Sequence, residues 1–387
     1  MSGMNFLERL LDGGAVEWKP LGEVAKIQRG RRLVKSELEE VGKYAVFQNC
    51  MTPLGYYHES NAKSDTTFII SAGAAGEIGY SDVDFWAADD VYYFLTPENL
   101  KSKFLYYFLL TQQTKILGQV RRASVPRLSK TAFEKIPLPI PCPDNPDRSL
   151  AIQAEIVRIL DTFTALTAEL TAELTAEISD RKKQYNYYRD RLLTFEKGEV
   201  EWKPLGDVCS SISAGGDLPK NFAKGQVDPT DEFPYPIYAN ATGDNGLYGF
   251  TDGYKIESDA VTISARGAKI GYHAVREGKF TAIIRLITLV PNKNVVSTKY
   301  LNYILDMTPI GGTDGGIPQL TVPTVKKISI PIPPLEEQAR IVAFLDKFDT
   351  LITSISEGLP REIALRQKQY EYYRDLLLSF PPPLTPP

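Results

Sequence analysis

The chain has 387 residues, of which 43% are hydrophobic and 24% are charged, and this composition is that of an ordinary globular protein with about two to three domains. Its formal net charge of −4 excludes the strongly basic nucleic-acid proteins but is compatible with a local basic surface. The chain has three scattered cysteines, no signal-like N-terminus and no apolar run near about 20 residues, so we expect a cytoplasmic protein without disulfides or membrane spans.

A tandem repeat organises the chain. The motif EWKPLGEV at 17–24 returns as EWKPLGDV at 201–208, and KQYNYYRDRLL at 183–193 returns as KQYEYYRDLLL at 368–378. Shorter echoes pair KIPLPIP with KISIPIP and VPRL with IPQL. The repeated unit is much longer than the about 20 to 50 residues of a solenoid repeat. Each half is therefore predicted to be a globular region followed by a long helix.

The globular regions of the two halves have diverged far more than the segments that flank them. Both contain short aromatic and β-branched runs separated by Gly, Asn and Pro, which predicts mainly β domains with helices near 100–113 and 297–305. Two domains that read different targets would diverge in this way, and so would two domains that drifted after duplication. The predicted fold class is α+β, with two mainly β domains separated by two long antiparallel helices and an internal pseudo-twofold axis.

The first long helix is predicted because residues 149–196 contain no Gly and no Pro. At 1.5 Å per residue it would be about 70 Å long, so it needs a coiled-coil partner. The second helix, about 335–380, is the natural partner, although Gly358 and Pro360 should kink or break it. Helix-packing side chains are predicted at Ile156, Leu160, Phe163, Leu166, Leu170, Leu174, Ile178, Ile341, Leu345 and Phe348.

A four-residue repeat, LTAELTAELTAEI at 166–178, lies inside the first helix. Each added TAEL unit would lengthen the helix by about 6 Å, so the repeat could act as a ruler on DNA. It could equally be a tolerated slippage repeat in a spacer helix.

These features divide the chain into five segments. We predict an N-terminal domain at 1–140, a first spacer helix at 141–198, a second domain at 199–333, a second spacer helix at 334–380 and a disordered tail at 381–387.

Basic residues gather in the globular regions in spite of the acidic total. Region 19–135 has 16 basic and 13 acidic residues, and region 203–327 has 13 and 12. Arg and Lys in such loops can bind phosphates, and Arg, Asn and Gln can bind base edges. The candidate DNA-binding residues are Arg29, Arg31, Arg32, Lys35, Gln48, Asn49, Arg121, Arg122, Arg127, Lys130, Lys220, Lys224, Asn240, Arg266, Lys269 and Arg285. A solvated basic surface would explain any single one of them as well.

Catalytic motifs are lacking in the sequence. There is no GxxxxGK[ST] loop for ATP, no [DNS]PP[YFW] tetrapeptide of amino-methyltransferases, and the two histidines are isolated. The sequence predicts a protein that binds rather than catalyses, with no metal site and no cofactor of its own.

The order of these motifs resembles the specificity subunits of type I restriction–modification enzymes. The resemblance rests on the EWKPLG openings, the IPLPIP and ISIPIP exits, the IVxxLDxF helix starts and the QYxYYRDxLL helix ends. It covers nearly the whole chain. The TAEL repeat is most similar to the type IC branch of that family.

This resemblance implies two target recognition domains that each read one half of an asymmetric, bipartite sequence in double-stranded DNA. The helices would set the spacer and dock the partner subunits. Two modification subunits would bind S-adenosylmethionine and methylate adenine N6, and two restriction subunits would use ATP and Mg²⁺. The chain itself would be non-catalytic.

Two other functions remain open from the residues alone. One is a coiled-coil scaffold for protein interactions that does not read DNA, and the other is a stand-alone DNA-binding regulator. The glycine-rich loop SAGAAGEIGY at 71–80 contains no basic residue, whereas the matching loop SARGAKIGY at 264–272 contains Arg266 and Lys269. Contacts of these two side chains therefore cannot be transferred to the first half.

Overall fold

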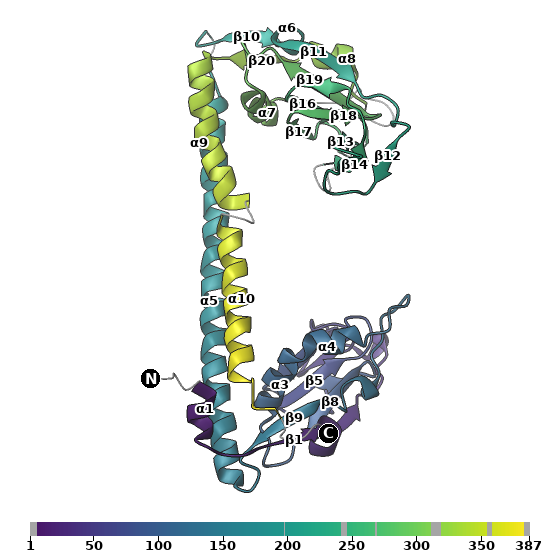
Figure 1. The fold of residues 1–387 in the computed structure, drawn as a ribbon, viewed down its shortest axis with the longest axis vertical. Coiled ribbons are helices and arrows are strands. Elements are labelled where there is room, and N and C mark those ends of the chain that lie inside the picture. Colours follow the sequence, from purple (N-terminus) through teal and green to yellow (C-terminus); the bar gives the residue numbers. More distant parts are fainter. Residues whose placement is uncertain are drawn as a thin grey trace. The chain divides into compact units, whose positions relative to one another are not determined.

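The computed structural model describes residues 6–196, 198–240, 246–267, 269–310, 319–353 and 358–382. The chain forms two compact units. Unit 1 comprises Met1–Glu173 and Ile363–Pro387, and unit 2 comprises Leu174–Glu362. Each unit contains one mainly β domain and parts of the long helices (Figure 1).

In unit 1 the domain begins and ends in one small sheet, because β1 (Val16–Pro20) pairs antiparallel with β9 (Pro137–Pro141). Between these strands lie a four-stranded sheet in the order β2-β8-β5-β6 and a three-stranded sheet in the order β4-β3-β7. The strands are β2 (Lys26–Arg29), β3 (Tyr44–Phe47), β4 (Gly55–Tyr57), β5 (Thr66–Ile70), β6 (Ile78–Ser81), β7 (Trp86–Ala87) and β8 (Val91–Leu95). The short helices are α1 (Phe6–Leu11), α2 (Leu21–Val24), α3 (Ser102–Thr111), α4 (Gln113–Gly118), η1 (Lys35–Glu37) and η2 (Lys130–Ala132).

Unit 2 repeats this plan in the same chain order. Its first and last strands, β10 (Glu201–Pro204) and β20 (Ser329–Ile332), pair antiparallel, and its four-stranded sheet has the order β11-β19-β16-β17. The second sheet has five strands in the order β12-β14-β13-β18-β15. The remaining strands are β11 (Cys209–Ala214), β12 (Phe222–Lys224), β13 (Tyr235–Tyr238), β14 (Leu247–Thr251), β15 (Ile256–Glu257), β16 (Ala260–Ser264), β17 (His273–Arg276), β18 (Lys279–Ala282) and β19 (Leu286–Pro291). The domain helices are α6 (Leu205–Val208), α7 (Thr298–Asp306) and α8 (Val322–Lys326). The predicted α+β class with two mainly β domains is confirmed.

The first long helix, α5 (Pro146–Leu193), runs unbroken for 48 residues, as its sequence predicts. The second is interrupted, and the structure describes α9 (Leu335–Thr353) and α10 (Leu359–Leu377) with residues 354–357 outside the described part. A side chain at Gly358 would meet the carbonyl oxygens of Thr350 and Leu351 at 2.5 and 2.6 Å. Pro360 is the second residue of α10, where its missing N–H costs nothing. The predicted break is therefore confirmed.

The long helices pack in pairs inside each unit. In unit 1 the Thr164 hydroxyl donates to the Tyr370 hydroxyl (3.1 Å), and the rings of Phe163 and Tyr373 lie 5.8 Å apart. In unit 2 the ring of Tyr188 lies 5.3 Å from Phe344 and 5.9 Å from Phe348. The side chains of Ile156, Leu160, Ile341 and Leu345 are at most 1% exposed and join the cores beneath the domains.

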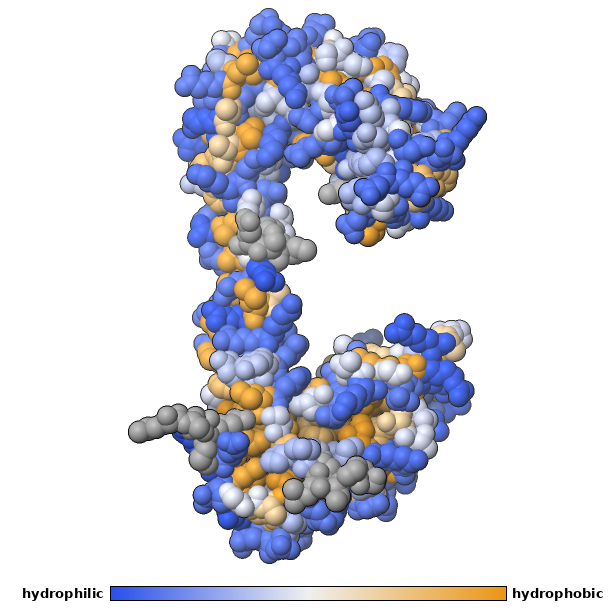
Figure 2. All heavy atoms as spheres, viewed as in Figure 1, coloured by the Kyte–Doolittle hydropathy of each residue, from blue (hydrophilic) through white to orange (hydrophobic). Residues whose placement is uncertain are grey.

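The prediction for Leu166 is wrong, because half of its surface (50%) is exposed in the chain. The hollow that α5 shares with α3 and α10 is lined by Thr and Ala positions of the TAEL repeat, such as Thr167 and Ala168, so α10 faces these small residues. Because neighbouring residues differ by about 100° around a helix, the side chain of Leu166 points away from the face that Thr167 presents to α10. Leu170, Leu174 and Ile178 are half-buried. Figure 2 shows that some hydrophobic residues are exposed on the surface of the long helices.

A buried glutamine fixes each domain to a long helix. The side chains of Gln153 in α5 and Gln338 in α9 are 0% exposed. Gln153 accepts a hydrogen bond from the N–H of Lys101 (2.9 Å), and Gln338 accepts one from the N–H of Ser297 (2.9 Å). Both hydrogen bonds are made at the start of the domain helix, which is α3 in unit 1 and α7 in unit 2. The amide therefore locks the same domain helix to the same long-helix position in each unit.

A second duplicated contact lies two turns further along each long helix. In this Lys–Tyr–Asp cluster an aspartate of the long helix binds a lysine and a tyrosine that are one turn apart on the domain helix. Its members are Lys103, Tyr107 and Asp161 in unit 1, and Lys299, Tyr303 and Asp346 in unit 2. The tyrosine–aspartate distances are 2.6 and 2.7 Å. The duplication thus preserves the joint between domain and helix.

Candidate nucleic-acid interface

Two predicted basic segments that are distant in the sequence meet in unit 1. Arg29 is the last residue of β2, whereas Arg121 and Arg127 belong to the segment that follows α4. All three side chains line one hollow of about 320 Å³, together with Gln119 and Ser129. The long-range pairing of the four-stranded sheet brings them together, which the sequence alone does not show.

The loop between Arg121 and Arg127 is a tight, anchored turn. The N–H of Arg121 donates to the carbonyl of Arg127 (2.9 Å), and the N–H of Arg127 donates back (3.1 Å). The N–H of Gly73 donates to the carbonyl of Pro126 (3.1 Å), which ties the loop to the glycine-rich segment. Residues 122–125, which form the tip, are all exposed. The scaffold therefore presents Arg122 to solvent on a fixed loop.

The hollow is electropositive. The Arg29 Nε donates to the carbonyl of Asp89 (2.7 Å), which fixes the direction of this guanidinium without neutralising it. Among the residues that the structure describes, neither Arg121 nor Arg127 forms an ion pair, and both are exposed. Three guanidinium groups around one hollow form a geometry that suits a phosphate oxygen.

The other candidates in the first domain lie outside this hollow. Arg31 is held through its backbone, where its N–H donates to the carbonyl of Ala87 (2.9 Å). Lys130 forms an ion pair with Glu134 (3.7 Å), so part of its positive charge is neutralised within the domain. The remaining candidates lie on the surface of the domain, exposed except for the half-buried Gln48, and are Arg32, Lys35, Gln48 and Asn49.

In unit 2 a different set of candidates meets beside the four-stranded sheet. The Asn240 Nδ2 donates to the carbonyl of Arg266 (2.9 Å), and the N–H of Ala265 donates to the carbonyl of Arg285 (2.8 Å). Arg285 has a φ of +75°, a left-handed conformation that non-glycine residues adopt only when their surroundings hold them there. Gln319 forms an isolated antiparallel bridge with Arg266. Among the described residues, the Asn240 Oδ1 has no hydrogen-bond partner although it is buried.

Two candidate lysines in unit 2 lie elsewhere. Lys224 is the last residue of β12 in the five-stranded sheet, with its Nζ 5.6 Å from the ring centroid of Tyr248, and Lys220 precedes that strand. Lys269 is exposed in the loop after β16. The predicted set therefore divides into a group around Arg266 and a pair at β12.

Sequence reasoning missed three polar residues at these sites, and one of them carried a signal. The echo of VPRL and IPQL makes Gln319 the repeat equivalent of Arg127, so the sequence could have indicated Gln319 as a DNA-binding candidate. Gln119 and Ser129 carry no such signal, because only the fold brings them to the hollow.

One basic residue of the second domain is structural. Arg276 is 4% exposed, its guanidinium lies 3.9 Å from the ring centroid of Tyr238, and its Nε donates to Thr262 Oγ1 (3.0 Å). Burial lowers the pKa of the Arg276 guanidinium. Such a group stabilises the interior and is not available to DNA.

Neither histidine belongs to a metal-binding cluster. His58 Nδ1 lies 3.2 Å from Glu39, and His273 contacts Asn302 (3.0 Å) and Asp306 (3.4 Å). Within the described ranges there is no group of three or more metal-ligating side chains, and no helix is both long and apolar enough to cross a membrane.

Comparison with known proteins identifies relatives over the whole chain. Residues 15–180 and 197–365 match the model of the type I restriction modification DNA specificity domain. The specificity subunit of the type I restriction enzyme EcoR124I/EcoR124II from Escherichia coli is 37% identical, with 100% of this chain and 99% of that protein aligned. A putative type I specificity subunit from Haemophilus influenzae is also 37% identical, with 97% and 98% aligned. A solved structure described as the basis of complex assembly and conformational transition of the type I R-M system shares the fold, with a TM-score of 0.65, 18% identity and 95% and 98% coverage.

Proposed function

Because the chain belongs to the family of type I restriction–modification DNA specificity subunits, we propose that its two basic loop groups are the surfaces that contact DNA. The chain is the DNA-recognition subunit of such a system and is not itself an enzyme. The proposal assigns the finer roles to individual residues. The carrying observation is the convergence of Arg29, Arg121 and Arg127 on one hollow.

In the first domain we assign the hollow to the DNA backbone and the loop tip to the bases. Three exposed guanidinium groups can bind phosphate oxygens, and such contacts fix the register of a protein on the duplex. Arg122 is exposed at the tip of an anchored loop. An arginine presented in this way can bind a guanine edge in the major groove.

In the second domain we assign base reading to Arg266 and Gln319, and contacts with the DNA backbone to Arg285 and Lys269. Asn240 is assigned a positioning role, because its amide holds the carbonyl of Arg266 and its Oδ1 is buried. Arginine and glutamine have the hydrogen-bonding geometry for bidentate contact with purines. Because these side chains differ from those of the first domain, each domain would read a different half of an asymmetric, bipartite site. The pair Lys220 and Lys224 would contact phosphates outside that half-site.

The finer assembly also belongs to this proposal. The repeated QYxYYRD segments leave Tyr187 and Tyr372 58% and 64% exposed, and such surfaces suit a protein partner. Two modification subunits and two restriction subunits would dock on the helices, carry S-adenosylmethionine, ATP and Mg²⁺, and act in the cytoplasm. In this proposal the two target recognition domains are residues 1–140 and 199–333, and the subunit belongs to the type IC branch. Family membership favours this function over a DNA-independent scaffold or a stand-alone regulator.

The first test is a map of N6-methyladenine in the host, with and without this gene. We expect deletion to remove one bipartite motif, and an unchanged map would contradict the recognition role. The residue assignments are then tested in the methyltransferase complex. Arg266→Ala should relax one base position at a cost of about 1–3 kcal/mol, and the double change Arg121→Ala and Arg127→Ala should lower the salt slope of binding by about two.

Matched controls remove a cation of the same domain that lies outside the assigned surface. Lys63→Ala breaks an ion pair with Asp84 (3.1 Å), and Lys279→Ala breaks one with Glu257 (2.9 Å). Both controls should methylate the wild-type motif with the wild-type salt dependence. Equal behaviour of test and control variants would contradict the residue assignments.

A further inference from the structure

The joint between domain and helix in unit 1 has an unusual distribution of contacts. On α5 the side chains of Ile156 and Leu160 are 0% exposed in the shared core. Asp161 follows at once. The next residues on this side, Thr164 and Ala165, line an open hollow of about 410 Å³ that also reaches Tyr80 of the domain. Beyond Asp161 the Tyr107 hydroxyl still lies 3.2 Å from the Thr164 hydroxyl, at the edge of this hollow.

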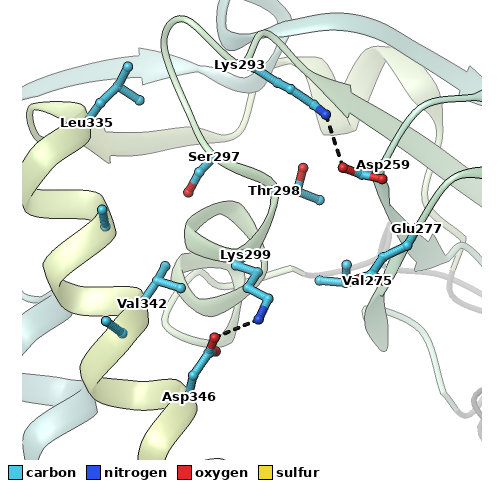
Figure 3. Close-up of a pocket in the computed structure, with 12 residues that line it drawn as sticks. Asp259, Val275, Glu277, Lys293, Ser297, Thr298, Lys299, Leu335, Val342 and Asp346 are labelled. Carbon is cyan, nitrogen blue, oxygen red and sulfur yellow. Dashed lines mark hydrogen bonds and ion pairs between the residues drawn. The ribbon is translucent and has the colours of Figure 1, made fainter.

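In unit 2 the aspartate of the cluster also lies beside open hollows. Leu345 of α9 is buried at 0% exposure, and Asp346 follows it. Asp346 lines two hollows, of about 540 and 410 Å³, between the domain and the long helices. Figure 3 shows Lys299 of α7 reaching across the larger hollow to Asp346, with Val342 and Leu335 on the α9 wall. Lys299 and Tyr303 therefore bind Asp346 between these two hollows.

The chemistry of this contact favours orientation over stability. The side chains of Lys103 and Asp161 are 32% and 39% exposed, so water screens their attraction. The tyrosine hydroxyl supplies a short, directional, charge-assisted hydrogen bond. Burial raises the pKa of the Tyr107 and Tyr303 hydroxyls, which keeps both protonated as donors. An apolar contact at the same place would hold the domain against the helix without fixing the angle between them.

We propose that the two Lys–Tyr–Asp clusters are positioning devices that make the complex selective for spacer length. This inference rests on the proposed function, in which each domain reads one half-site. A domain of about 125 residues is about 35 Å across, and one base pair rises 3.4 Å, so a tilt of about 5° at the joint moves the far side of the domain by one base-pair step. Each half-site needs its own fixed joint, and the cluster is present in both units.

The test measures methylation of sites with altered spacers by the complex with its modification subunit. Substrates carry the mapped half-sites with the native spacer, one base pair fewer and one base pair more. The test variants are Asp161→Asn, Asp346→Asn, Tyr107→Phe and Tyr303→Phe. We expect the ratio of native-spacer to altered-spacer methylation to fall about fivefold in each, because a partly exposed ion pair or a charge-assisted hydrogen bond is lost. The half-site bases should remain the same.

Matched controls remove ion pairs that lie wholly within the same long helices. Glu155→Gln breaks the pair with Arg158 (2.7 Å) in α5, and Glu337→Gln breaks the pair with Arg340 (2.6 Å) in α9. Each pair joins two residues that are three positions apart on one helix. Both controls should keep the wild-type spacer ratio.

The outcomes separate the inference from the function on which it rests. If the wild-type complex methylates no bipartite motif, the proposed function fails. If it does, and the test variants keep the wild-type spacer ratio, the positioning role is overturned. A loss of half-site selectivity together with spacer selectivity also overturns it, because that is general damage to the domain. The Tyr→Phe variants keep the packed rings and decide the matter if an Asn variant does not fold.

Discussion

Replacing the buried glutamines by leucine should weaken the attachment of each domain to its long helix. Besides its bond to the N–H of Lys101, Gln153 donates to the carbonyl of Asn99 (3.0 Å) and to the hydroxyl of Ser149 (3.1 Å). Leucine fills the space but leaves the N–H and the carbonyl without partners. Each unsatisfied group costs about 1–3 kcal/mol, and partial exposure of these backbone groups places the sum at about 2–4 kcal/mol.

The same arithmetic applies to Gln338, which donates to the carbonyls of Val295 and Pro333, each at 2.9 Å. For units of this size, 1 kcal/mol corresponds to about 2–4 °C, so each variant should lower the unfolding temperature of its unit by about 5–15 °C. The assay is thermal and urea unfolding of the full chain. Gln184→Leu, on the exposed face of α5, is the control and should stay within about 0.5 kcal/mol. Test variants as stable as this control would refute the reasoning.

Two further predictions concern the domains themselves. Gly30→Ala and Gly215→Ala should each cost about 2–3 kcal/mol in thermal unfolding, because a methyl group would collide with the carbonyl oxygens of Ala88 and Ile283; Gly118→Ala, which meets nothing within 4 Å, is the control. The N–H of Gly278 and the Lys293 ammonium hold the pKa of the Asp259 carboxyl below its usual range. Its stabilising effect is therefore present above the ordinary pKa of about 4 and is lost as the pH falls through the lowered value. Asp259→Asn should be less stable than wild type near pH 7 and equal to it near pH 2 in urea unfolding, and a constant difference would contradict the assignment.

Local signals in the sequence predicted the elements, and long-range pairing explains most of what they missed. The absence of Gly and Pro gave the unbroken α5, and Gly358 with Pro360 gave the break between α9 and α10. The convergence of Arg29 with Arg121 and Arg127 was not predictable, because it depends on the order β2-β8-β5-β6 and on the bridge between Ala72 and Arg127. Periodicity likewise identified the leucines of the TAEL repeat but not the face that meets α10, which misplaced Leu166.

The repeat places the residues of the two joints at equivalent positions, but it does not show what they contact. Gln153 and Gln338 occupy equivalent positions in the repeated helix start, as do Asp161 and Asp346. Their partners on α3 and α7 were not recognisable from the sequence, since the domains have diverged so far. The echo of VPRL and IPQL is visible in the sequence, but only the fold shows that Gln319 lies beside Arg266.

The two glycine-rich loops share a backbone conformation and differ in the side chain that it presents. Ala72 forms an isolated bridge with the VPRL segment, and Arg266 forms the same kind of bridge with the IPQL segment, so these two residues are counterparts. Each is followed by a glycine with a positive φ, Gly73 at +78° and Gly267 at +90°. A side chain on Gly73 would lie 2.6 Å from the carbonyl oxygen of Asn49, so this turn resists substitution. The residue before the glycine can change without disturbing the turn, and an alanine in one domain against an arginine in the other is the difference expected when one scaffold is adapted to two different half-sites.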